Sequence, residues 1–157
     1  MGSIPDAFSG SRYKDFPNEE FFAGCINDLI GMADKDEPKH RKCVSYLRKL
    51  CHFFSAVDYY VSFEGQNSNE WAQVTIDKRG LRINLSVPFN ESFKSMFAKQ
   101  NIGIPSTWKV TYFKKGKVLT FETGENNVGV IASFLSVVFI GLYRCPNNYK
   151  VAATFRI

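Results

Sequence analysis

The feature that most constrains the fold is an uncharged apolar run from Val128 to Tyr143, with the sequence VGVIASFLSVVFIGLY. A transmembrane helix needs about 20 residues and a buried strand uses roughly 4 to 8, so a run of sixteen favours a buried helix. Glu125, Asn126 and Asn127 supply capping groups and a favourable charge at its start, and Arg144, Cys145 and Pro146 mark its end. The run therefore predicts a long helix that is apolar on all sides and must be covered on several of them.

Two alternatives for this run stay open. Its β-branched residues are compatible with a buried strand or strand pair, because packing can override local propensity. Membrane insertion is the other alternative, but the run contains Ser133 and Ser136, and basic residues flank it on both sides, so no orientation is favoured. We therefore do not expect a membrane to be a partner.

Composition indicates a globular protein. The 157 residues, 45% hydrophobic and 15% aromatic, are enough to bury a sizeable core. We expect residues 1–16 to form a flexible leader and residues 17–157 to form a single α+β domain. No apolar segment of a secretory signal is visible, so we expect a cytoplasmic protein with reduced cysteines. The net charge of +5 permits nucleic acid or an acidic protein as a partner and requires neither.

The segment after the leader predicts two helices, over 19–33 and over 38–55. The acidic stretch Asp34–Asp36 between them is typical of a capping loop, and Pro38 fits the first turn of the second helix. The second helix is basic, and its basic side chains include Arg41 and Lys42.

The second half of the chain contains a faint internal repeat. Val74–Gly80 (VTIDKRG) resembles Val110–Gly116 (VTYFKKG) at an offset of thirty-six. Each copy predicts a β-hairpin whose glycine takes a positive φ, and a helical segment follows each hairpin. The resemblance fits either a duplication or two common hairpins that are alike by chance.

Strands are also expected over Tyr59–Phe63 and Tyr149–Arg156. Together these elements predict an α+β fold with two N-terminal helices and a mainly antiparallel five- or six-stranded sheet built from two hairpin-helix units. The long apolar helix is expected to pack on that sheet. We expect the final strand to lie at a sheet edge, where it could pair with a partner.

No sequence pattern dictates a chemistry. His40, Cys43, Cys51 and His52 resemble zinc ligands, but residues 40 and 51 of one helix are about 16 Å apart at roughly 1.5 Å per residue. Zinc ligands all lie within about 2.3 Å of one ion. Phosphate-binding glycine motifs and the nucleophile elbow are also missing from the sequence. We therefore expect no catalytic residue, no metal and no cofactor, and a protein that is not an enzyme.

Two functions fit these properties. The first is a non-enzymatic protein-binding module, with a regulatory, chaperone-like or immunity-type role, that acts through a sheet edge or the basic helix. The alternative is a single-stranded nucleic-acid-binding protein that uses basic hairpin tips and aromatic residues. We expect a protein partner first, nucleic acid second, and leave a homo-oligomer open. The candidate binding surface comprises Lys78, Arg79, Lys114, Lys115, Lys117, Arg41, Lys42, Tyr59, Trp71 and Trp108.

Overall fold

The structure, a computed structural model, describes residues 9–15, 19–47, 59–77, 80–123, 127–146 and 149–156. Its elements are β1 (Ser9–Asp15), α1 (Glu19–Leu47), β2 (Tyr59–Glu64), β3 (Trp71–Asp77), β4 (Gly80–Ser86), α2 (Phe93–Lys99), β5 (Lys109–Lys114), β6 (Val118–Glu122), α3 (Val128–Val137), the π-helical segment η2 (Val138–Leu142) and β7 (Lys150–Arg156). The strands form one seven-stranded sheet in the order β1-β7-β2-β3-β4-β6-β5, and all its described pairings are antiparallel. The predicted α+β class is therefore confirmed.

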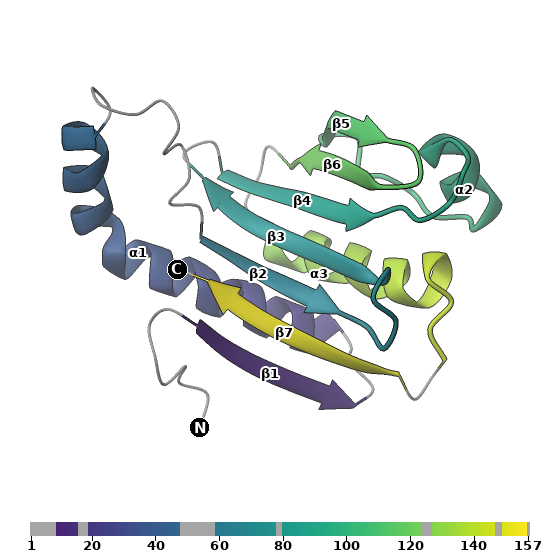
Figure 1. The fold of residues 1–157 in the computed structure, drawn as a ribbon, viewed down its shortest axis with the longest axis horizontal. Coiled ribbons are helices and arrows are strands. Elements are labelled where there is room, and N and C mark those ends of the chain that lie inside the picture. Colours follow the sequence, from purple (N-terminus) through teal and green to yellow (C-terminus); the bar gives the residue numbers. More distant parts are fainter. Residues whose placement is uncertain are drawn as a thin grey trace.

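Helices and sheet form two layers. Alternate residues of β2 are buried, namely Tyr59, Val61 and Phe63, which is the pattern of a strand with one face against a core. The buried faces of the strands pack with the first half of α1 and with α3 in a single apolar cluster. Figure 1 shows α1 and α3 behind the sheet, and none of the described helices covers the opposite face.

One long helix replaces the two predicted N-terminal helices. α1 continues through Asp34–Asp36, where a loop was expected, and ends at Leu47. Pro38 lies inside the helix. A proline at such a position removes one backbone hydrogen bond and favours a bend, but the helix can continue past it. Figure 1 shows that the axis of α1 turns, so that its C-terminal part projects away from the sheet.

The central apolar run is helical but is not one long α-helix. Asn127 caps α3 as predicted, because its Oδ1 accepts a hydrogen bond from the Val130 N–H at 3.2 Å. The last five residues instead form η2, in which the N–H of Tyr143 donates to the carbonyl of Val138. The expected cover is also incomplete: α1 and the sheet bury two sides of the run, while Val137 stays 42% exposed.

The sheet has more strands than predicted, and the final strand occupies a different place. β1 lies within the segment predicted as a leader and pairs with β7 from Ser9↔Arg156 to Asp15↔Lys150. β7 also pairs with β2, so it is an interior strand and the prediction of an edge position was wrong. Local sequence gives no register between segments so far apart in the chain, which is why the position of β7 could not be predicted.

The two predicted hairpin-helix units are present. β3 and β4 precede α2, and β5 and β6 precede α3. Gly80 and Gly116 take the positive φ values, 115° and 75°, that the hairpin prediction requires. The units meet where β4 pairs with β6, so the order β3-β4-β6-β5 is symmetric about this pairing.

A tyrosine hydroxyl ties η2 to the sheet. The Oη of Tyr143 lies 2.8 Å from the carbonyl oxygen of Trp71 and 2.8 Å from that of Ser86. These carbonyls belong to β3 and β4 at the end of the sheet that η2 reaches. Burial raises the pKa of Tyr143 well above its ordinary value, so the hydroxyl remains a donor at all ordinary pH values.

We predict that Tyr143→Phe lowers the free energy of unfolding by about 1–3 kcal/mol, because it takes the hydroxyl donor away from the carbonyl oxygens of Trp71 and Ser86. Chemical denaturation followed by circular dichroism measures this change. Tyr112→Phe is the matched control, since Tyr112 is 52% exposed and should change stability little. Equal midpoints for both variants would contradict the anchoring role.

Candidate functional site

One edge of the sheet, β5, is accessible. This strand pairs only with β6 among the described elements, and five of its six residues are exposed. Val110 is 40% exposed and Tyr112 is 52% exposed, which is high for large apolar side chains. A register shift between these two residues forms a β-bulge. Bulges and flanking lysines, here Lys109 and Lys114, are typical of edge strands that must avoid indiscriminate pairing.

An apolar groove lies beside α3, next to the connection between α2 and β5. Its volume is about 510 Å³, and its polar lining includes asparagines such as Asn101 and Asn127. Three exposed aliphatic side chains follow the outer face of α3 and η2 at helical spacing, namely Val130, Val137 and Ile140. The first two also line the groove, so the uncovered side of the apolar run forms its wall.

The sheet face opposite the helices is polar. At its centre the hydroxyl of Thr120 donates to Asn84 Oδ1 at 2.8 Å, and Asn84 Nδ2 donates to Gln73 Oε1 at 3.2 Å. These bonds link β6, β4 and β3, so the polar side chains stabilise one another across strands. The alternation along the strands places further side chains on this face, among them Tyr60, Trp71, Arg82, Tyr112 and Lys114.

The predicted binding residues do not form one surface. Tyr59 is 7% exposed and faces the core, and its register partner is Ile76, whereas Trp71 lies opposite Glu64 at the other end of the same strand pair. Trp108 packs on the rings of Phe121 and Phe134.

Among the basic members of that surface, the structure brings three together. Lys114, Lys115 and Lys117 are exposed together at the β5–β6 hairpin. Arg41 and Lys42 lie on the C-terminal part of α1, and Lys78 and Arg79 lie outside the described residues. Sequence reasoning found the hairpin lysines but missed the β5 edge, although a short strand bounded by two lysines is a sign of an edge.

Metal ligands and cysteines were considered from the sequence as candidates for chemistry. Within it, no three His, Cys, Asp or Glu side chains gather where they could hold a metal ion. Cys51 and His52, which the zinc hypothesis needs, are not among the described residues. Burial raises the pKa of the Cys145 thiol to about 12, and the nearby Glu70 carboxylate acts in the same direction. This cysteine therefore stays protonated and is a poor nucleophile.

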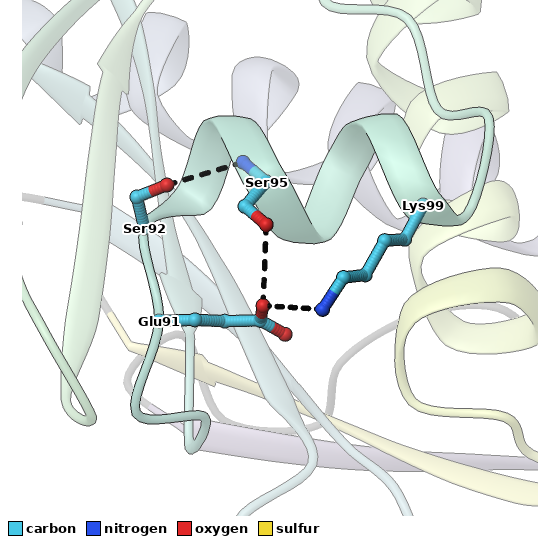
Figure 2. A network of polar contacts seen from close by, with 4 residues as sticks. All are labelled: Glu91, Ser92, Ser95 and Lys99. Atoms are coloured by element: carbon cyan, nitrogen blue, oxygen red, sulfur yellow. Dashed lines mark hydrogen bonds and ion pairs between the residues drawn. The ribbon is translucent and has the colours of Figure 1, made fainter.

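A small polar network fixes the start of α2 (Figure 2). The hydroxyl of Ser92 caps the helix by accepting from the Ser95 N–H at 3.2 Å. Glu91 Oε2 accepts from Lys99 Nζ at 2.8 Å and from the Ser95 hydroxyl at 3.2 Å. The hydrogen bond from Lys99 is the main cause that lowers the pKa of Glu91, and the charge of Lys115 adds to it. The network is solvated and stabilises a helix end rather than forming a reactive site.

Comparison with known proteins yields no match: no family model, no curated protein and no solved structure shows significant similarity to this chain. Within the described ranges, none of the helices combines the length and the apolar character that crossing a membrane requires.

We predict that Lys99→Met raises the pKa of Glu91 toward the ordinary glutamate value, because it removes the main donor to the carboxylate. The folded-state pKa is lowered, so this contribution to stability is present above the ordinary pKa and is lost as the pH falls through the folded-state value. An NMR pH titration of the Glu91 carboxyl carbon measures the shift. Lys94→Met, on the same helix, serves as the control, and an unchanged titration in Lys99→Met would contradict the prediction.

Proposed function

We propose that the protein is a non-enzymatic protein-binding module, with a regulatory, chaperone-like or immunity-type role, that binds a segment of its partner by strand addition at β5. The observation that supports this proposal most directly is the exposure of β5, whose outer side has no described neighbour in the sheet. Such an edge offers a row of backbone N–H and C=O groups to an extended peptide.

The side chains of β5 favour it over the other edge strand. β5 combines Val110 and Tyr112, which are large and exposed, whereas β1 has the mainly polar sequence SGSRYKD. Burial of exposed apolar area would add to the backbone hydrogen bonds of an incoming strand. β7, where the sequence predicted an edge, is paired on both sides and offers no such surface.

The proposal predicts that Val110→Lys abolishes selection of peptides by the protein, because it places a charge on the core-facing side of the edge. The measurement is panning of a phage-displayed random peptide library on the immobilised full chain. We expect enriched peptides to alternate β-branched and polar residues and to be lost with Val110→Lys. Ile140→Lys is the matched control, since Ile140 is also exposed but lies on η2. Enrichment that survives Val110→Lys, or no enrichment, would contradict strand addition.

A second candidate function is the binding of single-stranded nucleic acid. The observation that favours it is the group of exposed lysines at the β5–β6 hairpin, Lys114, Lys115 and Lys117, beside the exposed ring of Tyr112. A cation cluster next to an aromatic ring is a common element of single-strand sites.

For this second function, replacing the three hairpin lysines with Glu should weaken binding of a fluorescent oligonucleotide without unfolding the protein. The salt dependence of the affinity should also decrease, because fewer phosphates are neutralised. Fluorescence anisotropy at two salt concentrations measures both quantities. Lys94→Glu on α2 is the control, and salt-insensitive or absent binding by the unmodified protein would exclude this function.

A further inference from the structure

We infer that the segment recognised at β5 runs antiparallel to this strand, presents apolar side chains opposite Val110 and Phe113, and presents acidic side chains opposite Lys109 and Lys114. This inference rests on the proposed function and specifies the chemical class of the partner. It excludes a second copy of this chain as the occupant of the edge.

The orientation follows from the symmetry of the two hairpin units. In the order β3-β4-β6-β5, β5 stands where β3 stands in the other unit. The outer side of β3 is covered by β2, which pairs antiparallel with it over six register pairs. The outer side of β5 has no described counterpart of β2. A partner strand that completes the second unit as β2 completes the first therefore runs antiparallel to β5.

The apolar positions follow from which side chains of β5 face the helices. Val110 lies opposite Phe121, and Phe113 lies opposite Leu119, and both residues of β6 are fully buried. Neighbours across antiparallel strands share a face, so the partner residues beside Val110 and Phe113 also face the helix layer. β2 occupies the equivalent position beside β3, and its core-facing Val61 is fully buried.

The core side beside β5 is already apolar. Phe113 packs edge-on against Phe93 of α2 with ring centroids 5.2 Å apart. Phe121, the register partner of Val110, packs against Phe134 of α3 at 5.7 Å. An apolar side chain added beside β5 therefore continues an existing aromatic cluster, whereas a charged one would be desolvated there.

The acidic positions follow from the two lysines that bound β5. Lys109 and Lys114 are exposed and lie opposite Glu122 and Val118 on the face away from the helices. Carboxylates across from them would form favourable cross-strand ion pairs. Two copies of β5 paired antiparallel about their centre would instead place Lys109 of one opposite Lys114 of the other. Like charges directly opposite are destabilising, and the net charge of +5 on each copy acts in the same direction.

Two synthetic peptides test the inference with the full-length protein. The first is acetyl-Ser-Glu-Val-Thr-Ile-Glu-Ser-amide, and the second has Lys in place of both Glu residues. We expect the acidic peptide to shift the NMR amide signals of Lys109–Lys114 and to bind about tenfold more tightly than the basic one, with the difference shrinking at high salt. A spin label in place of the N-terminal acetyl group of the acidic peptide should broaden the Lys114 signal more than the Lys109 signal.

Each alternative outcome overturns one part of the inference. Equal affinity of the two peptides, or binding of neither, overturns the acidic partner class. Stronger broadening at Lys109 overturns the antiparallel orientation. A dimer in analytical ultracentrifugation that dissociates in Val110→Lys overturns the exclusion of a second copy. None of these results decides the proposed function itself, because the library selection with Val110→Lys tests strand addition without assuming charge or orientation.

Discussion

The antiparallel pairing of β4 with β6 is the interaction on which the rest of the structure depends. It joins the two hairpins into one sheet over five register pairs and buries Ile83 and Leu85 against Phe121 and Leu119. These residues are separated by more than thirty positions in the chain, so the pairing must offset a substantial loop-closure entropy. Their core-facing side chains belong to the apolar cluster against which α3 packs. Without this pairing, each hairpin would be a marginally stable two-stranded unit.

The layered arrangement determines which surfaces remain available for binding. Both α1 and α3 pack on the same sheet face, so the polar face and the β5 edge remain accessible among the described elements (Figure 1). The apolar run, which a fully covered helix would have buried, instead exposes Val130, Val137 and Ile140 along one side. We expect a binding site where burial is incomplete. A partner that covers an exposed apolar side chain or pairs with a strand edge gains binding free energy.

Sequence reasoning succeeded where the determining interactions are local. The hairpin glycines Gly80 and Gly116, the cap at Asn127 and the strand character of 149–156 all depend on neighbouring residues, and all were predicted. It was wrong where long-range contacts determine the position of a strand in the sheet, as for the interior position of β7 and the pairing of β1. The prediction of a loop at Asp34–Asp36 was wrong for a different reason. Residues of low helix propensity reduce the stability of a helix but do not prevent it from forming.

The candidate site was predicted only in part. The lysines at the β5–β6 hairpin were identified, since a hairpin tip is solvated in nearly any fold. Tyr59 and Trp108 were assigned to the same surface because strand patterns do not tell which face of a sheet is covered, and both rings pack toward the core side. The exposure of Val110 depends on the strand order, which the sequence does not encode locally.

The most direct test of this account is amide hydrogen exchange of the free protein, resolved residue by residue. Among the described strands, β5 is at an edge of the sheet and β7 lies between β1 and β2. Alternate amides of β5 should therefore exchange rapidly, while the amides of β7 from Ala152 to Arg156 should be protected by neighbours on both sides. Uniform protection of Lys109–Lys114 together with rapid exchange of alternate amides from Ala152 to Arg156 would contradict the strand order and, with it, the proposed binding edge.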